Sequence, residues 1–187
     1  MTEENSKMKG TIRKGHGHRN DLVGEHRFSD IGQLLFLAVF LTIWILDSFV
    51  FHFSDFLDDY IPLYVKLPIA CIILVISGYF AFMGLKKVFR EKRDSPEVIK
   101  SGVFAYSRHP IYLGSILVYL GWILLTFSLS SLGIWIIIII FYEFIATYEE
   151  TLLLQQFGEE YVKYKKEVSK WIPWKKLYRR KKEKKEN

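Results

Sequence analysis

Arg108, His109 and Tyr112 stand together at the start of one apolar segment, and a second apolar segment ends in Glu149 and Glu150. A guanidinium, an imidazole, a phenol and two carboxylates can together bind a polar ligand or move a proton. Charged groups at the edge of a membrane span are costly unless paired, so they are candidates for function. This combination favours an integral membrane enzyme over an anchor or a scaffold.

The apolar residues are gathered into long runs, although only half of the 187 residues are hydrophobic. Runs of roughly 20 apolar residues are long enough to cross the hydrocarbon core of a bilayer. We expect an all-α integral membrane protein with four transmembrane helices, the last two forming a C-terminal helical hairpin. The predicted spans are residues 31–51, 61–85, 110–127 and 129–148.

The basic residues predict the orientation of these spans. Of the 26 Lys and Arg, all but Lys66 lie before the first span, between the second and third, or after the fourth. Such asymmetry places both termini and the loop from Lys86 to Arg108 in the cytoplasm. It also explains the net charge of +6 without a nucleic-acid partner. The single cysteine, Cys71, excludes a disulfide within one chain.

The segments outside the spans divide the chain into a membrane domain, residues 29–174, and two tails. Residues 1–28 are polar and basic and are predicted to be disordered, and residues 175–187 form a polybasic tail. In the cytoplasmic loop, Ser95 and Pro96 are typical of the start of a short helix that Gly102 would end. After the fourth span, apolar residues recur near helical spacing and predict an amphipathic helix on the cytoplasmic leaflet, with Gly158 as a possible break.

Two sequence blocks resemble a known superfamily. The first runs from Gly102 to Gly114 and contains Arg108-His109-Pro110-Ile111-Tyr112. The second runs from Glu149 to Tyr161 and continues with Tyr164, Val168 and Trp171-Ile172-Pro173. In this order, around a membrane hairpin, they are similar to the motifs of the isoprenylcysteine carboxyl methyltransferases and phospholipid methyltransferases. The resemblance implies methyl transfer from S-adenosyl-L-methionine, held at the cytoplasmic ends of the last two spans. The implied cofactor-binding residues are Tyr106, His109, Pro110, Tyr112, Gly114, Glu149 and Glu150.

Arg108 and Glu143 are the candidate catalytic residues. Arg108 could hold the carboxylate of the methionyl group, because a guanidinium pairs bidentately with a carboxylate. Glu143, or else Glu150, could act as a base if the methyl acceptor is an amine, which must lose a proton. A carboxylate acceptor needs mainly a cation to orient it. Both an isoprenylcysteine-type carboxylate and a phospholipid-type amine remain open, and either acceptor would enter sideways from the lipid bilayer. No metal site is predicted.

Three other interpretations of the chain stay open. Membrane reductases that use NADPH on sterols share an Arg-His-Pro-x-Tyr-x-Gly element, although Ile111 and Ser115 depart from their usual pattern. A non-enzymatic membrane adaptor could use the polybasic tail to recruit anionic lipids or partners. The acidic pair could also serve only to pair with Arg108 or His109. The oligomeric state is not predicted, and a prokaryotic plasma membrane and the endoplasmic reticulum are equally compatible.

Overall fold

The computed structural model describes residues 27–90 and 96–174. Within these ranges the chain forms helices and connecting loops, without a strand. The α-helices are α2 (Arg27–Ile45), α3 (Leu63–Leu85), α4 (Pro110–Thr126), α5 (Leu129–Phe157) and α6 (Glu159–Glu167). Short π and 3-10 segments are η2 (Leu46–Phe51), η3 (Asp58–Tyr60), η4 (Lys86–Arg90) and η5 (Gly102–Ala105). Of the predicted tails, residues 1–26 and 175–187 lie outside the described residues, whereas Arg27 and Phe28 belong to α2.

Three helical segments are long and apolar enough to cross a membrane: Ile31–Phe51, Leu63–Arg90 and Leu129–Phe157. The helix between the last two, α4, is apolar but has only 17 residues. Large apolar side chains such as Leu34, Val75 and Phe144 are mostly exposed. A helix that is apolar on all sides is suited to lipid rather than to water. The chain is therefore an integral membrane protein.

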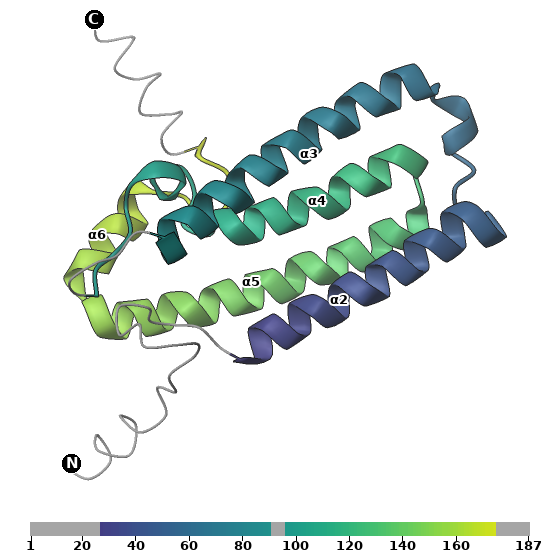
Figure 1. Cartoon of the computed structure of the whole chain (residues 1–187). Coiled ribbons are helices and arrows are strands. Elements are labelled where there is room, and N and C mark those ends of the chain that lie inside the picture. Colours follow the sequence, from purple (N-terminus) through teal and green to yellow (C-terminus); the bar gives the residue numbers. More distant parts are fainter. Residues whose placement is uncertain (1–26, 91–95, 175–187) are drawn as a thin grey trace, which may run out of the picture.

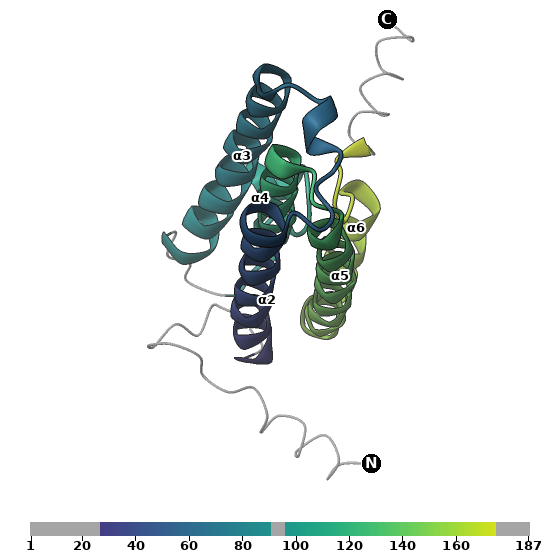
Figure 2. The same cartoon turned by 90° about the vertical axis from the view of Figure 1, so that its right-hand side faces the viewer.

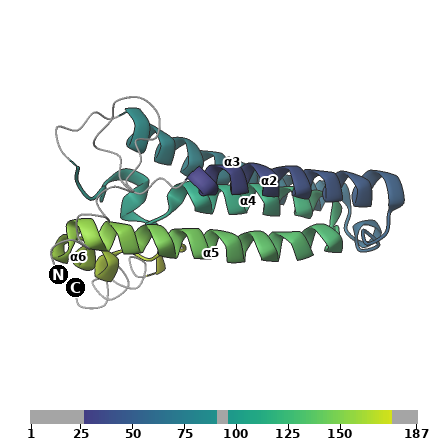
Figure 3. The same cartoon turned by 90° about the horizontal axis from the view of Figure 1, so that it is seen from below.

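The four long helices run side by side, and α6 lies at the end of the bundle where α4 begins and α5 ends (Figure 1). Viewed along the bundle, α3 and α5 lie on opposite flanks, with α2 and α4 between them (Figure 2). From below, α5 extends along one side of the bundle and α6 folds back at its end (Figure 3). The first turn of α4, the end of α5 and α6 are thus gathered in one region.

Glycine allows α3 and α4 to approach each other closely. A Cβ atom on Gly114 would lie 2.9 Å from the backbone oxygen of Ser77 and 2.9 Å from the backbone nitrogen of Ala81. The Ser77 hydroxyl donates a 2.7 Å hydrogen bond to the Gly114 carbonyl, which joins the two helices. Small residues at such contacts are the usual means of helix association in membranes.

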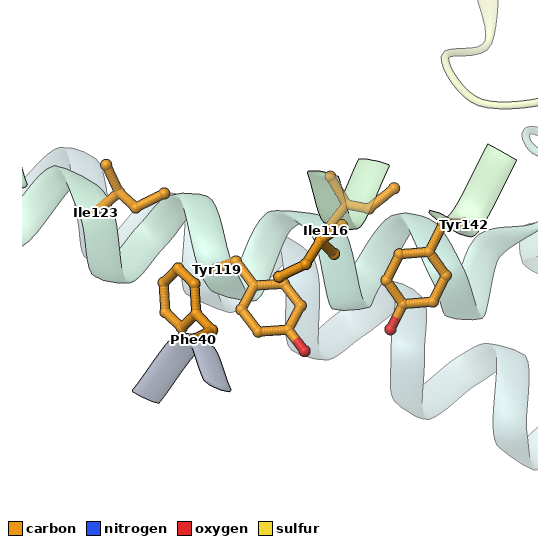
Figure 4. Close-up of a cluster of buried hydrophobic side chains, with 6 residues drawn as sticks. Phe40, Ile116, Tyr119, Ile123 and Tyr142 are labelled. Atoms are coloured by element: carbon orange, nitrogen blue, oxygen red, sulfur yellow. The ribbon is translucent and has the colours of Figure 1, made fainter. Parts of the chain in front are cut away.

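A buried cluster joins α2, α4 and α5 in the centre of the bundle (Figure 4). The rings of Phe40 and Tyr119 meet edge to face, with their centroids 4.7 Å apart. Tyr142 reaches the same region from α5 and is hydrogen-bonded to Tyr119 and Ser115. The buried members are Phe40, Ile116, Tyr119, Ile123, Ile138 and Tyr142. This cluster packs the middle of α4 against α2 and α5.

At the opposite end of the bundle, Asp47 joins the loop after η2 to the loop between α4 and α5. Its carboxylate accepts a 2.9 Å hydrogen bond from the Ser54 backbone nitrogen and bonds from the Ser54 and Ser128 hydroxyls. Ser128 also caps α5 by accepting from the backbone nitrogen of Ser131 at 3.1 Å. The Asp47 side chain is buried, so its place in this fold is that of a loop anchor.

The helix was expected to continue beyond the fourth span, predicted at residues 129–148, and this is confirmed because α5 runs without a break to Phe157. The short helix expected to begin at Ser95 and Pro96 is wrong, because residues 96–100 form no helix and a 3-10 turn begins only at Gly102. The break at Gly158 is confirmed: its φ of +49° is one that side-chain-bearing residues rarely adopt, and it separates α5 from α6.

Candidate active site

The Arg108-His109-Pro110 motif lies immediately before α4 and is fastened to the segment after α6. Pro110 is the first residue of α4, where its missing N–H costs no helical hydrogen bond. The Arg108 backbone nitrogen donates to the Ser169 carbonyl at 3.1 Å, and the Ser107 hydroxyl donates to the Lys170 carbonyl at 2.9 Å. These bonds fix the backbone that presents Arg108 and His109.

Arg108 is committed to partners within the protein. Its Nε and Nη2 atoms donate to Glu150 Oε1 at 2.9 and 2.8 Å, and the side chain is only 9% exposed. Its Nη1 atom donates to the carbonyls of Lys165 and Val168 at 3.1 and 2.8 Å. One guanidinium thus joins the start of α4 to α5 and to the last turn of α6.

His109 lies between the two carboxylates of the acidic pair. Its Nε2 atom is 3.2 Å from Glu150 Oε1, and its Nδ1 atom is 3.6 Å from Glu149 Oε2. Burial alone would lower the pKa of His109, but the nearby carboxylates of Glu149 and Glu150 outweigh this effect and raise the pKa. Because a carboxylate only accepts, an imidazole facing two of them is best satisfied when both nitrogens carry protons.

The rings of Tyr112 and Trp171 pack against His109. The Tyr112 ring is parallel to the imidazole at a centroid distance of 5.8 Å, and Trp171 is tilted against it at 5.9 Å. Tyr112 also lies 5.2 Å from Tyr142, and its hydroxyl donates to Glu149 Oε1. The site therefore combines a carboxylate with several π faces, an arrangement that suits a cationic or nucleoside-like ligand.

Glu143 binds a different set of partners. Its carboxylate accepts from Lys170 Nζ and, at 2.7 Å, from the indole nitrogen of Trp171. Lys170 Nζ also donates to the Thr147 hydroxyl at 2.7 Å. Glu143 is half exposed, and its bonds to Lys170 and Trp171 attach the segment after α6 to α5.

The structure brings most of the predicted site residues together. Arg108, His109, Tyr112, Glu149 and Glu150 form one connected network, with Pro110 in the adjoining turn. Gly114 lies one turn further along α4, at the contact with α3, and Tyr106 is partly exposed in the preceding loop.

Two residues of the network were not predicted from the sequence. Lys165 donates to Glu150 Oε2 at 3.0 Å from α6, and nothing in its spacing indicates this role. Trp171 packs against His109 from the segment after α6, and its place in the second motif block was the available signal for this contact. Both contacts depend on the chain folding back at Gly158.

Helix α6 is attached to the site by a buried aromatic face. Tyr161 and Tyr164 pack with Val98 and Val168, and the Tyr164 hydroxyl donates to the Phe104 carbonyl at 2.7 Å. Burial raises the pKa of both tyrosines far above the ordinary value, so both hydroxyls stay protonated. The sequence predicted an amphipathic helix on the cytoplasmic leaflet. In the structure this helix, α6, packs its aromatic face against other residues of this chain, including Val98 and Val168.

Comparison with known proteins identifies a family model and several relatives that match this chain. The family model described as phospholipid methyltransferase matches residues 64–160, just over half of the chain. A Saccharomyces cerevisiae protein-S-isoprenylcysteine O-methyltransferase is 30% identical over 57% of this chain and 48% of its own length. The human protein-S-isoprenylcysteine O-methyltransferase is 33% identical over 46% of this chain and 31% of its own length. An uncharacterized protein of Haemophilus influenzae is 41% identical over 33% of this chain and all of its own length.

The chain spans half or less of the length of the named methyltransferases that it matches. No solved structure matches it significantly. The matched region of the family model contains α3, α4 and α5 and thus the motif and both carboxylates of the acidic pair. On this evidence the chain belongs to the phospholipid methyltransferase family.

Proposed function

We propose that this protein is a membrane methyltransferase that uses S-adenosyl-L-methionine to methylate a lipidic acceptor. The observation that carries the proposal is the His109–Tyr112–Glu149 group, held at the start of α4 beside the end of α5, within the region matched by the family model. The relatives named as O-methyltransferases support the same reaction class.

The residues present fit the proposed donor. S-adenosyl-L-methionine supplies a methyl group activated by a positively charged sulfur. Glu149 can accept hydrogen bonds from an ammonium or a ribose hydroxyl, and the faces of Tyr112 and Trp171 suit a sulfonium or an adenine ring. Tyr106 and Pro110 would line the same region. In such a site the chain contributes alignment and exclusion of water rather than a covalent intermediate.

The acceptor is proposed from the names of the relatives. The isoprenylcysteine O-methyltransferases favour a carboxylate on a prenylated cysteine, which is already a nucleophile and needs no base. The family description favours an amine on a phospholipid headgroup, for which Glu143 would accept the proton. Both acceptors carry a lipid tail and can reach the site from the bilayer.

The topology that goes with this function has four spans, with α4 as the short third span. Both termini and the site would then face the cytoplasm, as the distribution of basic residues indicates. The water-soluble donor would enter from the cytoplasm and the acceptor from the membrane.

Calorimetric binding of S-adenosylhomocysteine to the detergent-purified protein tests the proposal. We expect micromolar binding, weakened in Glu150→Gln and unchanged in Glu167→Gln, a matched control whose carboxylate is exposed on α6. NADPH in a parallel cell tests the reductase: binding of NADPH alone overturns the proposal in its favour, and binding of neither ligand favours the adaptor.

Transfer of a labelled methyl group then identifies the acceptor. We expect product with N-acetyl-S-farnesylcysteine that releases its label in mild base, because a methyl ester hydrolyses there and a methylated amine does not. Base-stable label on phosphatidylethanolamine would assign the amine instead.

A further inference from the structure

A charged pair lies on an exposed face of the membrane-spanning helix α5. Glu143 belongs to the apolar segment Leu129–Phe157, and its side chain is 50% exposed beside Ile140 and Phe144, which are more exposed still. It precedes Glu150 by seven positions, which is about 10 Å along a helix at 1.5 Å per residue. A carboxylate at that depth is costly unless it is paired, and such residues are commonly functional.

Lys170 is the partner of Glu143. Its Nζ atom donates to Glu143 Oε1 and, at 2.7 Å, to the Thr147 hydroxyl, and it lies 5.9 Å from the centre of the Trp171 ring. An ammonium has three N–H donors, and within the described residues Lys170 uses two of them in hydrogen bonds. The ammonium can therefore bind a second carboxylate, or exchange Glu143 for it.

The segment that carries Lys170 is attached directly to the candidate active site. The Lys170 carbonyl accepts a 2.9 Å hydrogen bond from the Ser107 hydroxyl, just before the motif. Trp171 packs against His109 at a centroid distance of 5.9 Å, and its indole N–H donates to Glu143 at 2.7 Å. A ligand held by Lys170 would thus lie between the exposed face of α5 and His109.

The other cations that contact the site are committed to the protein. The Arg108 side chain is only 9% exposed, and all three of its guanidinium nitrogens donate to Glu150 or to backbone carbonyls. Lys165 binds Glu150 Oε2 from α6, which lies outside the membrane-spanning segments. Among these described cations, Lys170 is the one whose carboxylate partner is exposed on a membrane-spanning helix.

We propose that Lys170 binds the carboxylate of a prenylated cysteine acceptor arriving from the bilayer, and that Glu143 is the counter-ion which this carboxylate displaces. The inference rests on the proposed function and names the residue that selects the acceptor. The charge of Lys170 attracts a carboxylate and repels an ammonium, so it favours the first acceptor class over the second.

Methyl transfer itself would end this binding. An oxygen of the bound carboxylate forms a bond to the methyl carbon, while the bond from that carbon to sulfur breaks and its electron pair stays on sulfur. The carboxylate and the sulfonium each lose their charge, and no proton is released. The methyl ester no longer attracts Lys170 as an anion does, so Glu143 regains its partner and the product returns to the bilayer.

The test measures methyl transfer to N-acetyl-S-farnesylcysteine by the full-length, detergent-purified protein, and its inhibition by the corresponding amide, which lacks the negative charge. We expect wild type to bind the carboxylate about tenfold or more tightly than the amide, because a charge-assisted hydrogen bond is lost in the amide. Lys170→Met should raise the KM for the carboxylate by about tenfold or more and leave inhibition by the amide unchanged. Lys170→Arg should restore the preference, and S-adenosylhomocysteine binding should stay within about twofold of wild type in both variants.

Glu143→Gln separates acceptor binding from a structural role of the same ion pair. This variant keeps an oxygen that can accept from Lys170 and Trp171, but it removes the charge that competes with the acceptor. We expect the KM for the carboxylate to fall by about twofold or more. If Lys170 only attached its segment to α5, Glu143→Gln and Lys170→Met would raise this KM alike, and that result would overturn the proposal.

The double variant Lys170→Met/Glu143→Gln keeps the test valid if Lys170→Met does not fold. Replacing both partners leaves no unpaired charge at the lipid-exposed face. We expect the double variant to lose the preference for the carboxylate over the amide, as Lys170→Met does. Retention of that preference in either variant would show that another group binds the carboxylate.

The proposed function and this inference fail differently. If wild type does not bind S-adenosylhomocysteine, the proposed function fails. If wild type methylates phosphatidylethanolamine but not the farnesylcysteine, the methyltransferase stands and the role of Lys170 is overturned. The same holds if Lys170→Met methylates the farnesylcysteine with an unchanged KM.

Discussion

At the scale of single residues, the site depends on a histidine placed between two carboxylates. His109 is 6% exposed, and the favourable interactions with Glu149 and Glu150 exceed the cost of burying its charge. Arg108 and Lys165 also face Glu150, while Tyr112 and Trp171 face the ring itself. Protonated His109 therefore belongs to a network in which positive and negative groups alternate.

The raised pKa of His109 predicts how stability depends on pH. A group whose pKa is raised on folding contributes stability that is fully present below its unfolded value of about 6.5 and lost as the pH rises through the folded value. We expect wild type to melt above His109→Gln at about pH 6, and the difference to shrink as the pH increases to about 9. Melting curves of the two proteins across that range check it, and a constant difference would contradict it.

At the scale of helices, the contact between α3 and α4 sets the position of the motif. Because Ser77 and Ala81 present backbone atoms to Gly114, neither can move aside as a flexible side chain would. The first turn of α4, which carries Tyr112, is thereby held at a fixed distance from α3.

Gly114→Ala tests this contact. The new methyl group would meet backbone atoms at 2.9 Å, and such overpacking costs about 1–3 kcal/mol. The matched control is Gly133→Ala in α5, where a Cβ meets no atom within 4 Å. This control should be neutral or slightly stabilising, because alanine favours a helix by up to about 1 kcal/mol over glycine. Thermal unfolding in detergent measures both, and equal melting temperatures would show that α4 can shift.

At the scale of the whole molecule, the proposed topology places Asp59 and Glu159 on opposite sides of the membrane. We expect a membrane-impermeant maleimide to label Asp59→Cys, but not Glu159→Cys, in intact cells, with Cys71→Ser as the background. Both positions are exposed, so burial does not protect either cysteine. Labelling of both would contradict a shared cytoplasmic location for the site and the termini.

The sequence predicts the helices better than it predicts the contacts. Runs of apolar residues locate the first span at 31–51, and Pro110 marks the start of α4, because both signals are local. The helix α5 continues past Glu149 and Glu150, at the end of the predicted fourth span, and partners on other elements pair with these carboxylates there.

The composition of the site was partly predictable. Its motif residues cluster in the sequence and carry charge or aromatic rings, which identifies them as candidates. Lys165 and Trp171 reach the site only because α6 reverses at Gly158, and such a reversal brings together residues that no periodicity connects. The contacts of Glu150 likewise come from three residues at distant positions, Arg108, His109 and Lys165.

The shortness of α4 has a consequence for where the proposed methyl transfer would take place. Seventeen helical residues extend about 25 Å at 1.5 Å per residue, which is less than the roughly 30 Å of a bilayer's hydrocarbon core. Such hydrophobic mismatch draws the bilayer thinner around a helix or leaves its ends below the headgroups. In either case His109, at the start of α4, would lie closer to the bilayer centre than the headgroups of an undisturbed bilayer. A lipid acceptor could then reach the site while its acyl or prenyl chain stayed in the membrane. The proposed methyl donor would have to enter from the cytoplasmic surface.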